Sequence, residues 1–363
     1  MIPSVLIFLF LATILFFAFG APWLASRATQ AGTYAVYDMA GKPLYMRKPV
    51  QKGMIFAPVA DNFIIVDNSA KHVTALAPYI RDEAARTMLG KIFPDLLSKQ
   101  TAHTVQVTQP LGVEQTLLLN PDVVLLYDFQ AQPFEAAGFP GLARITSIRD
   151  REEKMFSLLE GLTGQSQRRQ SMFSRRQVLL EKLFASIPQN KPPVTTLTLS
   201  HKNYHLFSSL FENFNTNLRR CNAINLAEKP FAPSGVMNVE RLLKLNPEVI
   251  FLYDYRNDLT VQDIYGNEVL SGLQAVRNQR VYRMPRGIAR MTGPVEEPLL
   301  FYWMTQLLHP EITPVISFRQ LVKETYHDVF GYPLTDADVD DILNMRANES
   351  STGYHLFSAY SGK

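Results

Sequence analysis

The chain has 363 residues, of which 47% are hydrophobic and 19% charged, and its formal net charge at pH 7 is +3. This length can bury one large core or two medium ones, and the composition is ordinary for a soluble globular protein. The charge is small and evenly spread, which excludes nucleic acid as the expected partner, and the one basic run, residues 168–176, is predicted to be a solvated helix face.

The first twenty residues form a strongly apolar segment. No charge occurs between Val5 and Gly20, and small residues follow. This stretch is short for a membrane-spanning helix, and small residues at its end fit a signal-peptidase site. We therefore predict a signal peptide over residues 1–20 and a periplasmic location. No basic residue precedes the segment, so an uncleaved inner-membrane anchor stays the alternative. The lone Cys221 permits no intrachain disulfide, which suits a Gram-negative periplasm.

An N-terminal lobe is predicted over residues 33–150. Its first part, residues 33–46, has the pattern of a β-hairpin with a glycine turn. Residues 53–58 and 71–76 contain apolar runs that predict strands, and the apolar spacing of residues 81–97 predicts a single helix.

A sixteen-residue unit then occurs twice. Residues 113–128 (VEQTLLLNPDVVLLYD) and 239–254 (VERLLKLNPEVIFLYD) are identical at ten of sixteen positions. Each copy predicts a short helix, ended by an Asn-Pro pair because a residue before proline avoids the α region, and then a strand. The strand is apolar throughout, which is typical of a parallel sheet covered on both faces. A helix followed by a buried strand, repeated, indicates the α/β class with two similar lobes.

Between the copies, residues 151–190 predict an interlobe helical region. One helix would stop at Thr163-Gly164 and a second, over residues 165–187, would span about 35 Å. The C-terminal lobe is predicted over residues 191–346, and residues 347–363 form a tail of unassigned structure. In this lobe we expect strands at 194–199 and 280–284 and helices near 208–217, 269–278, 296–308, 317–330 and 335–345.

No nucleotide-binding glycine motif, HExxH or GxSxG occurs. In α/β sheets, ligands bind outside the carboxyl ends of strands, so the polar and aromatic residues there are the candidates for ligand contact. They are Tyr79, Arg81, Asp128, His201, Tyr204, His205, Tyr255, Arg256, Arg286 and Arg290. Arginine with tyrosine suits an anionic, partly aromatic ligand such as a metal chelate. His201 and His205 have a metal-ligand spacing, but we prefer contact with the ligand and expect no metal cofactor.

Glu114 and Glu240 occupy equivalent places, early on the helix of each copy. A carboxylate there suits the helix dipole and needs no partner. Two equivalent exposed carboxylates, one in each lobe, would also match arginines on a two-fold symmetric partner, and we favour this docking role mainly because of the family resemblance described next.

Six stretches together resemble the substrate-binding proteins of ABC importers for iron chelates, cobalamin and related metal compounds. They are residues 37–46, 112–128, 238–254, 273–287, 296–311 and 326–343. The resemblance implies two Rossmann-like lobes joined by one long α-helix, with a ligand cleft between them. It also implies that Glu114 and Glu240 engage arginine pockets of an ABC permease dimer in the inner membrane.

We therefore expect a monomeric binding protein and not an enzyme. The ligand ranked first is a ferric siderophore, followed by molybdate or tungstate and then by a haem, cobalamin or nickel complex. A chelatase-like two-lobed α/β enzyme and a scaffold that uses the two glutamates for another partner stay as alternatives.

Overall fold

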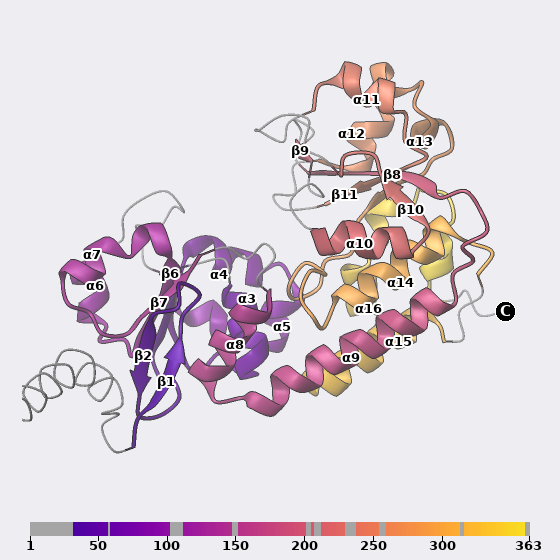
Figure 1. Ribbon diagram of the computed structural model, residues 1–363. Coiled ribbons are helices and arrows are strands. Elements are labelled where there is room, and N and C mark those ends of the chain that lie inside the picture. Colours follow the sequence, from indigo (N-terminus) through magenta and orange to yellow (C-terminus); the bar gives the residue numbers. More distant parts are fainter. Residues whose placement is uncertain are drawn as a thin grey trace, which may run out of the picture.

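The computed structural model describes residues 32–56, 59–101, 112–146, 152–200, 205–206, 212–228, 237–253, 259–312 and 316–359. Among these residues the strands form a two-stranded hairpin and two larger, mainly parallel sheets, one in each lobe (Figure 1). The predicted α/β class is confirmed. The predicted signal peptide lies outside the described residues. Within the described ranges, no helix is both long and apolar enough to cross a membrane.

The N-terminal lobe contains a five-stranded parallel sheet, counted over the described ranges, in the order β5-β4-β3-β6-β7. Its strands are β3 (Gly53–Ile55), β4 (Val73–Leu76), β5 (Gln100–Thr101), β6 (Val123–Tyr127) and β7 (Leu142–Ile145). Its helices are α3 (Ala60–Asp67), α4 (Pro78–Ala84), α5 (Met88–Ile92), η2 (Pro94–Ser98), α6 (Val113–Leu118), η3 (Asp128–Gln130) and α7 (Gln132–Ala136). The predicted hairpin is present as β1 (Tyr34–Tyr37) and β2 (Pro43–Met46). The Asp38 carboxylate accepts a hydrogen bond from the backbone nitrogen of Lys42 within the turn. It also accepts a 2.9 Å hydrogen bond from the buried side chain of Arg144 in β7.

The prediction of one helix over residues 81–97 is wrong, because the segment divides into α4, α5 and η2. Thr87 separates the first two with extended backbone, φ −134° and ψ 173°. The chain then folds back so tightly that a Cβ on Gly90 would lie 2.2 Å from the carbonyl oxygen of Ala84. Only glycine fits this close approach. Lys91 of α5 thereby reaches the C-terminal lobe, where it contacts Asp338 and Asp341 at 2.9 and 3.0 Å.

The interlobe region forms α8 (Glu152–Thr163) and the 20-residue α9 (Ser166–Ala185), separated by Gly164 with φ +73°. In Figure 1, α9 runs from the N-terminal lobe along the C-terminal lobe beside α15. The expectation of a solvated basic face on α9 is wrong. Arg168 donates to the carbonyl oxygens of Ile65 and Val329, one in each lobe, at 2.8 Å each. Arg175 pairs with Asp328 at 2.9 Å, so the basic run fastens α9 to its neighbours.

The C-terminal lobe has the sheet order β10-β8-β11-β12, with β9 antiparallel to β8. Its strands are β8 (Val194–Ser200), β9 (His205–Leu206), β10 (Ala223–Asn225), β11 (Val249–Leu252) and β12 (Val281–Arg283). Its helices are α10 (Glu212–Arg220), α11 (Val239–Leu245), α12 (Val261–Tyr265), η5 (Glu268–Leu270), α13 (Gln274–Arg277), α14 (Glu297–Leu308), α15 (Phe318–Phe330), α16 (Asp336–Ile342), η6 (Arg346–Asn348) and η7 (Tyr354–Phe357). The single helix expected near 269–278 is wrong, since η5 and α13 are separate there.

The tail belongs to the core of this lobe as far as Phe357. Tyr354 and Phe357 are fully buried beside Trp303, whose indole nitrogen donates to the Tyr354 hydroxyl at 3.2 Å. The Trp303 and Phe357 rings stack with their centroids 6.5 Å apart. These contacts account for the aromatic residues Tyr354 and Phe357 of the tail.

Both copies of the repeat have the same backbone conformation after the helix and the same kind of hydrogen bond to a neighbouring strand. Asn120 and Asn246 have left-handed backbone, with φ of 46° and 44°, as asparagine tolerates better than most residues. The acid after each Asn-Pro pair then accepts hydrogen bonds from the backbone at or near the start of the neighbouring strand. Asp122 accepts from the backbone nitrogens of Gln51 and Lys52 just before β3, and Glu248 accepts from Thr195 in β8. These bonds set the register of the central strand pair in each lobe.

The strands of the repeat are buried on both faces, as predicted. In β6, Val124 and Leu126 face a small core under α6 and α7, whereas Val123 and Leu125 belong to the largest apolar cluster. In β11, Ile250 and Leu252 likewise face a separate core while Val249 and Phe251 join that same large cluster. The inner faces of the two sheets therefore belong to one core that both lobes share.

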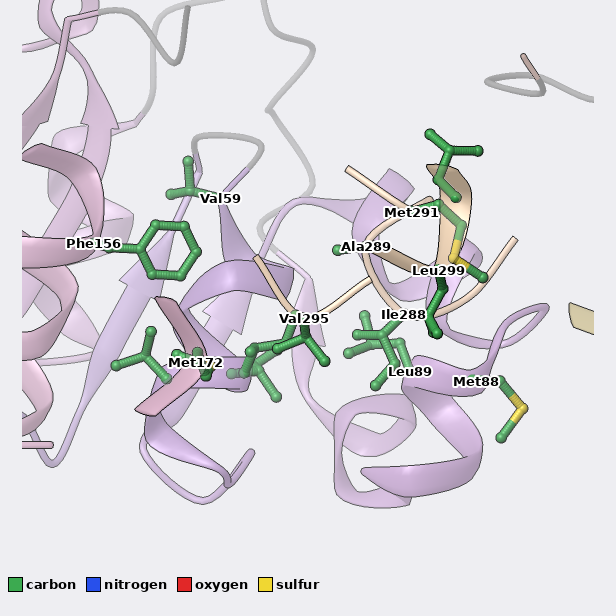
Figure 2. Close-up of a cluster of buried hydrophobic side chains, with 14 of the residues drawn as sticks. Val59, Met88, Leu89, Phe156, Met172, Ile288, Ala289, Met291, Val295 and Leu299 are labelled. Atoms are coloured by element: carbon green, nitrogen blue, oxygen red, sulfur yellow. The ribbon is translucent and has the colours of Figure 1, made fainter. Parts of the chain in front are cut away.

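This shared core continues across the boundary between the lobes. Figure 2 shows Leu89 of the N-terminal lobe beside Ile288 of the C-terminal lobe, with Val295 between them and Met172 of α9. All four side chains are at most 3% exposed. Phe93 of the N-terminal lobe also meets Phe330 of α15 edge to face, with centroids 6.3 Å apart. The lobes are therefore packed against each other and not merely connected by α9.

Candidate functional site

Two connections, each leaving the carboxyl end of a parallel strand in one of the two sheets, meet at the boundary between the lobes. Helix α4 follows β4 directly, and the segment of residues 284–296 follows β12. Both connections leave the carboxyl end of a parallel strand, where α/β folds bind ligands. Glu83 of α4 contacts Arg286 and Arg290 of that segment, which fixes the two connections against each other.

The buried carboxylate of Glu296 is hydrogen-bonded to the backbone of the segment that carries these arginines. Glu296 is 1% exposed and accepts from the backbone nitrogens of Ile288 and Ala289 at 2.8 Å each. It also accepts a bond from the Tyr326 hydroxyl, so its charge is well satisfied despite its burial. The carboxylate passes so close to Gly287 that any Cβ there would overlap it. Arg290 itself has φ +53°, a left-handed conformation that this network imposes.

Glu83 is the centre of the ionic contact between the lobes. Its carboxylate accepts from Arg290 Nε at 2.8 Å and from Arg286 Nη2 at 3.0 Å, and Arg290 Nη2 makes a further short contact. Burial alone would raise the pKa of Glu83, but the bonds and charges of Arg290 and Arg286 outweigh it and lower the pKa. Glu83 is therefore ionised at neutral pH. Arg286 and Arg290, which we predicted as ligand contacts, lie at the predicted edge and are bonded to Glu83.

A small cavity lies beside this contact, lined by Asp61, Tyr79, Ile80 and Arg290 among others. Its volume of about 20 Å³ suits one water molecule and is too small for a metal chelate. Burial raises the pKa of Asp61 to about 6, against the opposing charge of Arg290. Tyr79 is half-buried in the wall of this cavity, so the structure places it at the lobe boundary.

The remaining predicted ligand contacts have different surroundings. Arg81 is half-buried on α4. Asp128 is exposed at the end of β6, with its carboxylate 3.8 Å from Arg144. Beside it the ring of Phe129, 69% exposed, stacks on Tyr127 with centroids 5.3 Å apart. This pair is an aromatic surface at the carboxyl edge that the sequence prediction did not include.

Four predicted residues, His201, Tyr204, Tyr255 and Arg256, lie outside the described residues, and of His205 only the backbone in β9 is described. In the sequence, these residues come after β8 and β11. Within the part of the chain that the structure describes, histidine, cysteine and acidic side chains form no group of three or more that could hold a metal ion. Cys221 is buried, and burial raises the pKa of its thiol to about 12.

Glu114 and Glu240 are both exposed, in the first turns of α6 and α11. Each helix leads into a parallel strand and runs opposite to it, so its first turn lies toward the carboxyl edge of its sheet. Asn238 caps α11 by accepting from the backbone nitrogen of Arg241 at 2.8 Å, whereas no side chain caps α6. The two carboxylates therefore occupy equivalent positions, one on each lobe.

The structure thus has two parallel α/β lobes joined by one long helix, as the resemblance implied. Residues 79–286, more than half of the chain, match the periplasmic binding protein family, and the chain belongs to that family. The sequence-based assignment is thus confirmed, and the chain is a binding protein and not an enzyme.

Solved structures agree with this assignment. A periplasmic solute-binding protein from Veillonella parvula is 25% identical, with a TM-score of 0.74 over 87% of this chain and 98% of that one. The molybdate-binding protein MolA of Haemophilus influenzae is 15% identical, with a TM-score of 0.66 over 83% and 99%. The triscatecholate siderophore-binding protein FeuA of Bacillus subtilis is also 15% identical, with a TM-score of 0.53 over 83% and 100%. The last two are likenesses of fold alone. No curated protein sequence matches significantly.

Glu83, Asp61 and Glu296 are the residues of this boundary that sequence analysis missed. Glu83 lies inside a segment that we assigned to one regular helix, and its arginine partners are more than 200 positions away. Glu296 was assigned only as the start of α14. A glutamate close to an Arg-Gly pair is a weak signal by itself, so only the tertiary structure identifies these contacts.

Substitution of Glu83 by glutamine tests the ionic contact between the lobes. We expect the free energy of unfolding at pH 7 to fall by about 2 to 5 kcal/mol, because two largely buried arginines lose their carboxylate. Since the folded-state pKa of Glu83 is lowered, its contribution is complete above the ordinary glutamate pKa of 4.5 and is lost as the pH falls through the lowered value. The difference between wild type and variant should therefore shrink in acid. Urea denaturation at pH 7 and pH 3.5 measures both effects.

The matched control is Asp82→Asn, which alters an exposed acid on the same helix. We expect its stability to stay within about 0.5 kcal/mol of wild type. Equal losses in the two variants would contradict the assigned role of Glu83.

Proposed function

We propose that this protein is a periplasmic receptor that captures a metal chelate, foremost a ferric siderophore, and delivers it to an ABC permease dimer in the inner membrane. The observation that carries the proposal is the meeting of two connections from the carboxyl ends of parallel strands between two lobes, each of which exposes an equivalent glutamate. Membership of the periplasmic binding protein family supports both the capture of a solute and the periplasmic location. We further propose that residues 1–20 are cleaved as a signal peptide and that the mature protein is a monomer.

The side chains at the N-terminal edge favour a large aromatic chelate as ligand. Phe129 and Tyr127 offer a stacked pair of rings at the end of β6, and Arg81 adds a cation on the connection after β4, which β3 separates from β6 in the sheet. A bare oxyanion needs a compact set of polar donors, whereas flat aromatic groups of a chelate gain from ring contacts and from arginine. FeuA, crystallised with ferri-bacillibactin, and MolA, crystallised with molybdate, have this same fold, so the fold does not select between these ligands. Molybdate is therefore the second candidate.

Titration of the mature protein against a ferric tris-catecholate chelate, molybdate, haem and cobalamin tests the ligand. We expect quenching of intrinsic fluorescence by the ferric chelate, with a dissociation constant at least tenfold below that of molybdate. Arg81→Ala should weaken this binding roughly tenfold, since one charged contact contributes about 1.4 kcal/mol at that ratio. Arg86→Ala, an exposed arginine just beyond the same helix, is the control and should bind as wild type. Tightest binding of molybdate would reverse the order of the candidates.

Replacement of Glu114 and Glu240 by alanine together tests delivery to the permease. We expect uptake of the ligand by cells to be lost, because neither lobe can then pair with an arginine, while ligand affinity and thermal stability stay unchanged. The matched control is Asp95→Ala with Glu268→Ala, which removes one exposed acid from each lobe outside the repeat. Normal uptake by the Glu114/Glu240 double variant would refute the docking role.

A further inference from the structure

The two copies of the repeat expose the same pair of side chains in both lobes. Leu117 in α6 is 40% exposed and Leu243 in α11 is 36% exposed, and they occupy equivalent positions of the repeat. Each lies three residues after the exposed glutamate of its copy, a spacing that makes side chains neighbours on a helix surface. The inward faces of the same helices are filled by Thr116, 3% exposed, and Leu242, fully buried.

Each of these leucines leaves more than a third of its surface in solvent. The buried positions already belong to other residues of each helix, and single exposed leucines are common on protein surfaces. The unusual feature is that the same apolar side chain is exposed beside the same carboxylate in both copies of the repeat. At the next position the copies differ, with Leu118 in one and Lys244 in the other. The duplicated surface is therefore the Glu-Leu pair.

We propose that Leu117 and Leu243, together with Glu114 and Glu240, form two equivalent contact patches that fit a two-fold symmetric permease dimer. Each permease subunit would present an arginine with an apolar hollow beside it. This inference rests on the docking role proposed above for the two glutamates and adds the apolar half of the contact. A two-fold partner is the fitting occupant because symmetric assemblies offer the same surface twice, as the repeat does.

The glutamate and the leucine of each patch should affect binding in different ways. An ion pair in contact with water contributes little affinity, although it steers association and depends on salt. An apolar side chain that excludes water beside it strengthens the contact and slows dissociation. The glutamates would therefore set recognition and rate, and the leucines would set how long the complex lasts.

The test measures binding of the full mature protein to its permease in lipid nanodiscs at 50 and 300 mM salt. We expect Leu117→Ala with Leu243→Ala to raise the dissociation constant at least tenfold, mainly through faster dissociation, with an unchanged salt dependence. Glu114→Ala with Glu240→Ala should weaken binding and also flatten the salt dependence. Leu117→Met with Leu243→Met should bind as wild type, since methionine keeps the apolar volume.

The control variant is Leu97→Ala with Val178→Ala, which removes two exposed apolar side chains outside the repeat. Wild-type binding by the leucine-to-alanine variant, with weakened binding by the glutamate variant, would overturn the inference and leave glutamate docking in place. Wild-type binding by both would overturn docking as well. Lost thermal stability in the leucine variant, or a concentration-dependent dimer that these leucines hold together, would also overturn the inference, because the side chains would then serve the fold or self-association.

Discussion

The apolar core that passes between the lobes is the constraint on which the rest of this structure depends. Each sheet has one face in a core of its own lobe and the other in a shared core that reaches from β6 to β11. Leu89, Ile288 and Val295 close this core at the lobe boundary. Lobes joined only by a helix could change their relative orientation by bending it. Here such a motion would have to expose packed apolar surface.

Ion pairs and hydrogen bonds at the same boundary add to this apolar packing. Glu83 pairs with two arginines of the C-terminal lobe, Lys91 reaches α16, and Arg168 of α9 donates to both lobes. The C-terminal helices α15 and α16 thus fasten the N-terminal lobe from one side, and α9 lies along α15. A binding protein built in this way keeps the two glutamates proposed for docking at a set separation, which suits a partner whose two subunits are themselves at fixed positions.

The repeat combines structural and functional positions within sixteen residues. Its asparagine, its second acid and its apolar strand serve the fold, because they end the helix, hold the neighbouring strand and fill two cores. Its first glutamate and the leucine three residues later are exposed in both lobes. The strands of the repeat could be predicted from the sequence, because an unbroken apolar run has few alternatives. Local patterns also predicted the hairpin, α9, and the capped helices α15 and α16. They could not predict the break at Thr87 or the Glu83 contact, because a close approach of backbone and an ion pair between distant segments leave no periodic pattern. The basic run on α9 was misjudged for the same reason, since its acidic and carbonyl partners lie on other elements.

The central claim is that the two lobes form one body in which the docking sites are held at a fixed separation. Spin labels on Leu118→Cys and Lys244→Cys, at equivalent places on α6 and α11, measure this separation by electron-electron double resonance. Cys221 is buried, so the introduced thiols are labelled selectively. We predict one narrow distance distribution in the ligand-free protein that moves by less than about 3 Å on ligand binding, as in pre-organised complexes. A broad or two-peaked distribution, or a shift of many ångströms with ligand, would contradict it.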